Sequence, residues 1–208
     1  MRSRRSSYDR FKRVADALCA GIGLALLSPL FLLIGALISL DSPGGVFFRQ
    51  ERAGRDGVPF LIYKFRTMRV SNAPTRGAQD ENDPRITRVG RWLRRSSLDE
   101  LPQLINVLRG EMSLIGPRPA LLRHLERYDA EQRCRLEVRP GMTGLAQVSG
   151  RNALTWEEKI AYDIQYVEGY SLALDLRILL RTPRAILDQA SVYFRGRGSA
   201  WQAPEAKG

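Results

Sequence analysis

Residues 17–40 read ALCAGIGLALLSPLFLLIGALISL, a stretch of 24 residues without a charged side chain. As a straight α-helix it would be about 36 Å long, which is enough to cross a hydrocarbon core of roughly 30 Å. A secretory signal is a poorer explanation, because the run is long, has Pro29 at its centre and is followed by DSPGG instead of a small-residue cleavage site. The stretch therefore predicts a helix that enters a membrane.

The Ser28–Pro29 pair argues against a straight crossing. Proline inside a helix removes one backbone hydrogen bond and clashes with the carbonyl four residues earlier, so each half would be roughly 16 Å long. Arginines and lysines lie on both sides of the apolar stretch, and cytoplasmic loops are enriched in these residues. A re-entrant segment that breaks at Ser28–Pro29 and returns to the same face satisfies both features, and a kinked spanning helix is the alternative.

The composition of the whole chain favours an anionic partner. Its 208 residues include 33 Lys and Arg against 22 Asp and Glu, for a formal net charge of +11. A positive net charge favours binding to nucleic acid, phospholipid or a phosphorylated substrate, but it does not distinguish among these partners. Cys19 and Cys134 lack metal-type spacing and are interpreted as free thiols of a cytosol-facing protein. The lone His124 has no partner histidine or cysteine near it in the sequence and is assigned no role.

After Asp41 the pattern predicts an α+β fold that is mainly helical. The segment VFFRQERAGRDGVPFLIYKFRTM (46–68) has two runs rich in β-formers around the turn signal AGRDG, which is typical of a β-hairpin. The Gly-rich segment RPGMTGLAQVSGRN (139–152) predicts an ordered loop or short strands. A surface loop is expected over 70–85, and helical spacing occurs at 86–95, 119–137 and 155–170.

These patterns divide the chain into three expected parts. They are a basic N-terminus with a re-entrant membrane helix (1–41), a compact cytosolic catalytic domain (42–182), and a C-terminal amphipathic helix with a tail (183–208). The last boundary depends on the turn signals Thr182–Pro183 and Gly196–Gly198, which bracket an apolar run with arginines beside it. Such a helix is compatible with a membrane surface and equally with packing on the domain.

The stretch SSLDELPQL (96–104) places two adjacent carboxylates, Asp99 and Glu100, directly after a basic run. Ser and Asp ahead of an apolar stretch often begin a helix, and Pro102 suits a first turn because its missing N–H has no helical partner there. We therefore expect a helix that begins near Asp99 and stops at Gly110. A helix N-terminus also attracts anions, so the spacing leaves open whether the two carboxylates are a cap or a reactive pair in a phosphate site.

Several blocks of the sequence, taken in order, resemble the bacterial sugar transferase family, the monotopic phosphoglycosyl transferases that begin glycan assembly on a polyprenyl phosphate. The resemblance covers almost the entire chain, and the ordered set is far more specific than any one block. The blocks are FKRVADALCAGIGLALLSP, VFFRQERAG, IYKFRTM, ITRVGRWLRRSSLDELPQLINVLRGEMSLIGPRP, RPGMTGLAQVSGRN and YVEGYSLALDLRILLRT.

The resemblance implies a reaction and the residues that perform it. Asp99 would be a nucleophile and Glu100 a ligand of Mg²⁺, with a UDP-sugar as donor, polyprenyl (undecaprenyl) phosphate as acceptor and UMP as the leaving product. The membrane helix would be re-entrant and broken at Ser28–Pro29, with the enzyme on the cytosolic face of a bacterial inner (cytoplasmic) membrane. Leu145 and Ser149 stand where the family often has Trp and Asn, which leaves the identity of the sugar open.

Cations near the two carboxylates suit phosphoryl transfer, which is catalysed chiefly by positioning and by neutralising oxygens with Mg²⁺ and arginine. We expect Arg94, Arg118 and Arg151 to contact phosphate, against the plain alternative of solvated or headgroup-bound arginines. Pro117 and Pro119 make the segment around Arg118 stiff, so that it could shape a nucleotide pocket, and the resemblance places uridine there.

Two functions are compatible with these features. The first is an Mg²⁺-dependent ping-pong transferase that passes the phosphosugar through a covalent intermediate on Asp99. The second is a non-catalytic, membrane-tethered basic protein that binds lipid headgroups or RNA. Only the strand IYKFR interleaves aromatic and cationic residues as an RNA-binding sheet does, so no nucleic acid is expected. A phospholipid membrane is an expected partner, a homodimer is left open, and Asp175 is assigned only a structural role.

Overall fold

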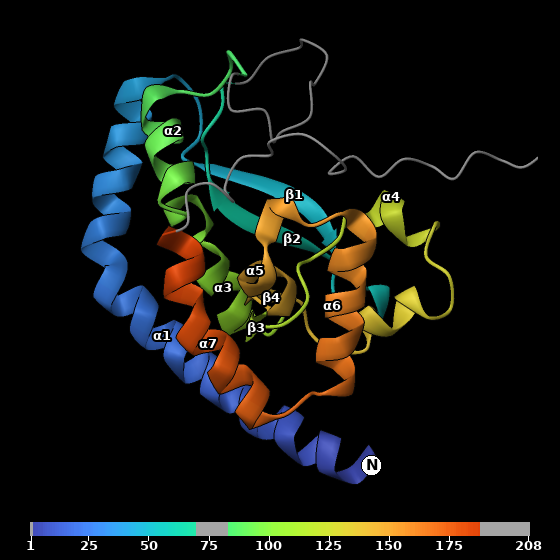
Figure 1. Ribbon diagram of the computed structural model, residues 1–208. Helices are drawn as coiled ribbons and strands as arrows, with labels where there is room; N and C mark the ends of the chain where they lie inside the picture. Colours follow the sequence, from blue (N-terminus) through green and yellow to red (C-terminus); the bar gives the residue numbers. More distant parts are fainter. Residues whose placement is uncertain (1, 70–82, 188–208) are drawn as a thin grey trace, which may run out of the picture.

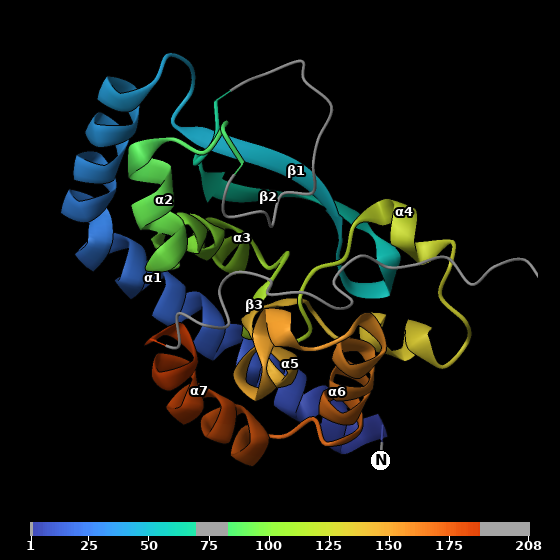
Figure 2. The same ribbon diagram turned by 45° about the horizontal axis from the view of Figure 1, so that its top comes forward.

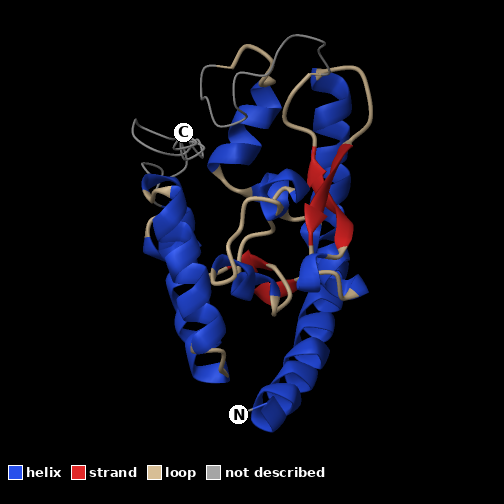
Figure 3. Cartoon of the chain, turned by 90° about the vertical axis from the view of Figure 1, so that its right-hand side faces the viewer, coloured by secondary structure: helices blue, strands red, loops and turns tan. Residues whose placement is uncertain are grey.

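The computed structural model describes residues 2–69 and 83–187 (Figure 1). Most of these residues are helical, and the named strands form two small two-stranded sheets (Figure 3). The mainly helical α+β class is therefore confirmed. Most of the expected surface loop over 70–85 and most of the expected C-terminal part lie outside the described residues.

Helix α1 (Arg2–Asp41) is one continuous helix that passes through Pro29. Pro29 has no N–H to donate to the carbonyl of Ala25, and the hydroxyl of Ser28 donates to that carbonyl instead, at 2.8 Å. Figures 1 and 2 show that the two halves of α1 run in different directions. The expected helix-break-helix is thus corrected to a single bent helix, because the Ser–Pro pair satisfies the carbonyl that proline leaves free.

One side of α1 is packed along much of its length. Lys12, Asp16 and Ala20 are buried in its first half, and Ile34 and Ile38 are buried in its second half. Arg13 of α1 donates to the carbonyls of Val107 and Leu108, near the end of a neighbouring helix. The opposite side of α1 exposes large apolar residues: Leu18, Ile22, Leu26, Leu32, Leu33, Leu37 and Leu40.

The expected hairpin is confirmed by strands β1 (Phe47–Ala53) and β2 (Pro59–Phe65), which pair antiparallel. The outer edge of β2 is covered by the side chain of Asn106. Its Oδ1 accepts from the amide of Tyr63 at 3.0 Å, and its Nδ2 donates to the carbonyl of Leu61 at 2.7 Å. A single buried amide therefore pairs with the strand edge as a third strand would.

Helix α2 (Arg88–Arg95) confirms the helix expected near 86–95, and Thr87 caps its first turn. The 3₁₀ turn η2 (Leu98–Glu100) follows, and helix α3 (Gln103–Arg109) begins only after Pro102. The expected helix start near Asp99 is wrong, because Ser97 is in the left-handed region (φ 57°) and the chain makes a tight turn before it becomes α-helical. The expected stop at Gly110 is confirmed by its left-handed φ of 85°.

The second half of the chain is built from short elements around a parallel strand pair. The region 119–137 forms two short helices, whereas the region 155–170 contains one regular helix that begins with a capping box at Thr155 and Glu158. The elements are β3 (Ser113–Ile115), α4 (Leu122–Leu125), η3 (Gln132–Leu136), β4 (Gly141–Thr143), α5 (Leu145–Ser149), η4 (Arg151–Ala153) and α6 (Trp156–Glu168), with β3 and β4 paired.

The last described helix, α7 (Leu172–Leu187), contains Pro183 in its interior. The expected start of a C-terminal helix at Thr182–Pro183 is therefore wrong. The hydroxyl of Thr182 donates to the carbonyl of Ile178 at 2.9 Å, and a proline near the end of a helix removes only one backbone bond. Beyond Leu187 the predicted C-terminal amphipathic helix lies outside the described residues and stays a prediction.

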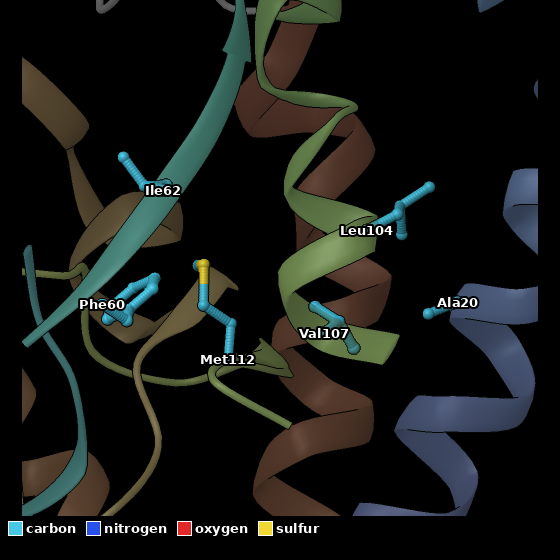
Figure 4. Close-up of a cluster of buried hydrophobic side chains, with 6 residues drawn as sticks. All are labelled: Ala20, Phe60, Ile62, Leu104, Val107 and Met112. Atoms are coloured by element: carbon cyan, nitrogen blue, oxygen red, sulfur yellow. The ribbon is translucent and has the colours of Figure 1, made fainter. Parts of the chain in front are cut away.

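Two apolar clusters join α1 to the rest of the chain. The first brings Ala20 of α1 together with residues of β2 and α3 around Met112, as Figure 4 shows. The second joins the other half of α1 to β2 and α2 through Ile34, Ile38, Phe65 and Leu93. Both halves of α1 are therefore part of the hydrophobic core.

Candidate active site

The turn that carries Asp99 and Glu100 is anchored on the apolar cluster that α1 shares with β2 and α2. Leu98 and Leu101 flank the two carboxylates and pack against the cluster of Ile34, Ile38, Phe65 and Leu93. Because a 3₁₀ turn has about three residues per turn, positions 98 and 101 share one side. The apolar side of the turn is thus fixed to the cluster formed by α1, β2 and α2, and the carboxylates of Asp99 and Glu100 lie on its other side.

Glu100 is held by two cations. Its Oε1 accepts from Lys64 Nζ at 2.5 Å and from Arg118 Nη2 at 2.6 Å, and its Oε2 accepts from Arg118 Nη1 at 3.3 Å. Burial alone would raise the pKa of Glu100, but Arg118 and Lys64 outweigh it and hold the pKa well below its usual range. Glu100 is therefore ionised at neutral pH.

Asp99 has a different environment, although it is the next residue. Within the described residues, no hydrogen bond or ion pair engages its carboxylate. Burial raises the pKa of Asp99 to about 6; Lys64 lowers the pKa and the charge of Glu100 raises it further. A carboxylate that is unpaired and more basic than usual is a better nucleophile than one held by cations. The two neighbours are thus suited to different roles.

The pair also fits a magnesium ion bound together with phosphate. Mg²⁺ is commonly held by one or two carboxylates plus phosphate oxygens of a substrate, and not by a cage of protein ligands. Over residues 2–69 and 83–187, no group of three or more His, Cys, Asp or Glu side chains could hold a metal ion. Asp99 and Glu100 could supply the protein's share of such a site, and Glu100 would then exchange a contact with Lys64 or Arg118 for the ion.

The three arginines predicted from the sequence all lie around this turn, and each makes a different contact. Arg118 contacts Glu100 directly, whereas Arg94 donates to Thr67 Oγ1 at 2.9 Å and its charge lowers the pKa of Asp99. Arg151 donates to Ser97 Oγ at 3.0 Å. Their contacts with substrate phosphate stay a prediction.

The Pro117–Arg118–Pro119 segment is rigidly held. Pro117 and Pro119 line a small hollow together with Ala53 and Gly54 of the hairpin. The carbonyl of Pro117 accepts from the amide of Gly141 at 2.8 Å, and that of Arg118 accepts from the guanidinium of Arg135 at 3.0 Å. The arrangement is consistent with a preformed pocket, and uridine binding there stays a prediction.

Two cations of the hairpin were missed by the sequence reasoning. Lys64 reaches Glu100 from β2, and Arg52 of β1 donates to the carbonyl of Pro119 at 3.3 Å. Burial and the nearby charge of Arg118 lower the pKa of Arg52 to about 10. Strand alternation predicts that Lys64 shares a face of the strand with Ile62, but it does not predict that this face lies opposite Asp99 and Glu100.

Residues that were given no catalytic role are accounted for by their contacts. His124 packs edge-on against Trp156, and burial and neighbouring arginines lower its pKa, so that it is neutral at pH 7. Asp175 is buried and accepts from Tyr8 at 2.6 Å, Lys12 at 2.5 Å and Tyr166 at 2.8 Å. The structural role assigned to Asp175 thus has a physical basis, because it joins α1 to α6 and α7.

Comparisons with known proteins extend over nearly all of these elements. Residues 7–189 match the family model described as bacterial sugar transferase. A UDP-glucose:undecaprenyl-phosphate glucose-1-phosphate transferase of Caulobacter vibrioides is 46% identical over 198 residues, which cover 91% of this chain and 74% of the relative. The exopolysaccharide production protein ExoY of Rhizobium meliloti is 45% identical over 193 residues, covering 84% of each chain. An uncharacterized sugar transferase, EpsL, of Bacillus subtilis is 45% identical over 176 residues, covering 85% of this chain and 87% of the relative.

Proposed function

This chain belongs to the bacterial sugar transferase family, and we propose that it transfers a sugar-1-phosphate from a UDP-sugar to undecaprenyl phosphate, as the first membrane step in the assembly of a glycoconjugate. The reaction is supported by the name of the Caulobacter relative, which specifies a nucleotide-sugar donor and a polyprenyl-phosphate acceptor. The observation that carries the mechanism is the unequal pair at the η2 turn: Glu100 is held by Lys64 and Arg118, and Asp99 is unengaged.

The proposed reaction consists of two displacements at one phosphorus. A carboxylate oxygen of Asp99 attacks the β-phosphorus of the UDP-sugar, the bond from that phosphorus to the bridging oxygen breaks, and UMP leaves with the electron pair. An oxygen of undecaprenyl phosphate then attacks the same phosphorus of the aspartyl-phosphosugar, and Asp99 leaves as a carboxylate. Splitting the transfer in this way allows a soluble donor and a lipid acceptor to react in turn.

The cations of the site have separate tasks in this scheme. Lys64 and Arg118 lie within hydrogen-bonding distance of Glu100, so they are placed to neutralise phosphate oxygens beside Asp99. Mg²⁺, when bound by the carboxylates and the diphosphate, would neutralise charge that develops on the leaving UMP. The stiff Pro117–Arg118–Pro119 segment would position the nucleotide.

We also propose that α1 inserts into one face of the inner membrane and does not cross it, with the catalytic domain in the cytosol. Ser7–Asp41 is long and apolar enough to cross a membrane. However, Lys12 and Ile38, near its two ends, are both buried against the same domain. A crossing α1 would draw that charged domain into hydrocarbon, which is costly, whereas a helix bent at Pro29 can keep the domain outside. Cysteine labelling that places the two ends of α1 on opposite faces would disprove this topology.

Incubation of purified protein with Mg²⁺ and a panel of UDP-sugars, without acceptor, tests the reaction. Native protein should release at most about one UMP per chain and gain a phosphosugar on the tryptic peptide 96–109, which contains Asp99. Addition of undecaprenyl phosphate should then release the adduct and permit turnover. If UMP appears only when the acceptor is present, direct transfer replaces the covalent mechanism.

A further inference from the structure

Arg151 connects the catalytic turn to the last described helix. Its Nη2 donates to Ser97 Oγ at 3.0 Å, and its Nη1 donates to the carbonyl of Ala185 in α7 at 2.9 Å. Ser97 lies two residues before Asp99. One guanidinium therefore spans the start of the η2 turn and the final turns of α7.

Both ends of the Arg151–Ser97 contact have unusual backbone conformations. Ser97 has a φ of 57° and Arg151 a φ of 51°, and among the described non-glycine residues only Asp56 is also positive. Left-handed backbone is unfavourable for residues with a Cβ atom and persists only where surrounding contacts hold it. The hydrogen bond from Arg151 is such a contact, so it helps to maintain the conformation that presents Asp99.

The outer face of α7 is suited to a phospholipid surface. Asp175 and Ile178 point into the protein and are buried, whereas the opposite side exposes a row of leucines with arginines beside it. Exposed leucines flanked by cations match the acyl boundary and the anionic headgroups of a membrane. The exposed residues are Leu172, Leu176, Leu179, Leu180 and Leu187, with Arg177, Arg181 and Arg184 beside them.

The buried side of α7 is joined to α1, which the proposed function already places in the membrane. The carboxylate of Asp175 in α7 forms a buried ion pair with Lys12 of α1 at 2.5 Å. Because α7 is joined to a helix that enters the bilayer, and because its exposed leucines have arginines beside them, phospholipid is the occupant that fits this face.

We propose that Arg151 is a positioning residue that couples the docking of α7 on phospholipid to the geometry of the Asp99–Glu100 turn. Lipid holds the last turns of α7, where Pro183 removes a backbone hydrogen bond, and the carbonyl of Ala185 then holds Arg151 against Ser97. The first displacement is consequently faster on a membrane than in detergent. This coupling rests on the proposed function but goes beyond it, because it makes the attack of Asp99 on a soluble donor depend on lipid.

The experiment measures single-turnover UMP release from a UDP-sugar with no acceptor present. Native protein is compared in nanodiscs that contain anionic phospholipid and in non-ionic detergent micelles. We expect release to be about fivefold or more faster in nanodiscs, which is the lower end of typical coupling between two sites. Leu176→Gln with Leu180→Gln should reduce the rate in nanodiscs to the native rate in micelles, and the adduct should still form on peptide 96–109.

Variants of the link distinguish positioning from a phosphate contact. Ser97→Ala and Arg151→Lys should each lower kcat in nanodiscs with little change in the KM for donor, and the ratio between the two preparations should fall to about one. Combining Ser97→Ala with the leucine changes should cause no further loss, because coupled sites are not additive. Val58→Gln, at another exposed apolar residue, should keep the full ratio and serves as the matched control.

Three results would count against the coupling or its basis. A ratio that survives Ser97→Ala, shown to be folded by its thermal unfolding, would overturn the coupling. A rise only in the donor KM of Arg151→Lys would replace it with direct phosphate binding by Arg151. Release that is equal in both preparations for native protein would also overturn it, whereas no release in any preparation would overturn the underlying function instead.

Discussion

Asp175 and Asp99 are both carboxylates in polar clusters that include a lysine, yet their surroundings differ. Asp175 accepts hydrogen bonds from Tyr8, Lys12 and Tyr166, which join three helices. Asp99 lies beside Lys64 and Glu100, but within the described part of the chain no such bond engages it. A carboxylate whose oxygens are satisfied stabilises the fold, whereas one that is left unpaired in a cationic site is available for chemistry.

The replacement Asp99→Asn should have the largest effect on activity. Asparagine keeps the size of the side chain but cannot form a stable phosphosugar bond, so both half-reactions should be lost, by on the order of 10³-fold or more. UMP release and the mass of peptide 96–109 measure this, and thermal unfolding should show that the variant is folded. Near-normal turnover in the folded variant would show that Asp99, like Asp175, is not a nucleophile.

The corresponding replacement Asp175→Asn should instead act on stability. The buried Lys12 would lose its ion-pair partner, and breaking a buried ion pair by removing one partner costs about 3–5 kcal/mol. The free energy of unfolding from denaturant titration should fall accordingly, with activity retained in the folded fraction. Asp56→Asn is the control, since its side chain is 73% exposed and its ion pair should contribute little.

Arg118→Ala tests how much a cation beside Asp99 and Glu100 contributes to use of the donor. One charge-assisted contact contributes about 1.5–3 kcal/mol, so the kcat/KM for the donor should fall roughly 10- to 150-fold. Binding to liposomes should hardly change, because many other lysines and arginines remain to contact anionic headgroups. Arg91→Ala, on the exposed side of α2, should leave both measurements unaltered. Equal losses of donor use and membrane binding would indicate that Arg118 binds headgroups.

The pH dependence of the first half-reaction should show the smallest effect. With the pKa of Asp99 raised to about 6, the nucleophile is protonated below that pH, and the rate at pH 5 should be about one tenth of the plateau. Stability should change in the opposite direction. The folded state binds this proton more tightly than the unfolded state does, so between about pH 6 and 4 this group's contribution to the unfolding free energy rises as pH falls. A rate that is flat from pH 8 to 5 would contradict the raised pKa.

Elements specified by local signals could be predicted from the sequence. The hairpin follows from β-rich runs on either side of a Gly-containing turn, and α2 and α6 begin at threonines that cap their first turns. Gly110 ends α3 because glycine readily adopts the left-handed conformation. The order of the sequence blocks likewise indicated the family, which the match over residues 7–189 shows.

Boundaries next to prolines could not be predicted reliably. Pro29 and Pro183 both lie inside helices that the sequence reasoning interrupted. A proline removes one hydrogen bond, but whether the chain then ends or only bends depends on nearby hydroxyls and on packing against the rest of the protein. Ser28 provides such a hydroxyl for Pro29, and burial of Ile34 and Ile38 holds the following turns.

By itself the sequence determined the apolar helix, the hairpin and the presence of two adjacent carboxylates among arginines, because these depend on composition and short spacing. Only the tertiary structure decided that Asp99 and Glu100 are unequal. Leu98 and Leu101 pack on the apolar cluster of α1, β2 and α2. Lys64 of β2 and Arg118 of the loop after β3 bind Glu100 and, among the described residues, leave Asp99 unpaired. Such contacts join positions far apart in the chain, and a carboxylate's reactivity is set by the charges and burial around it, which local sequence does not specify.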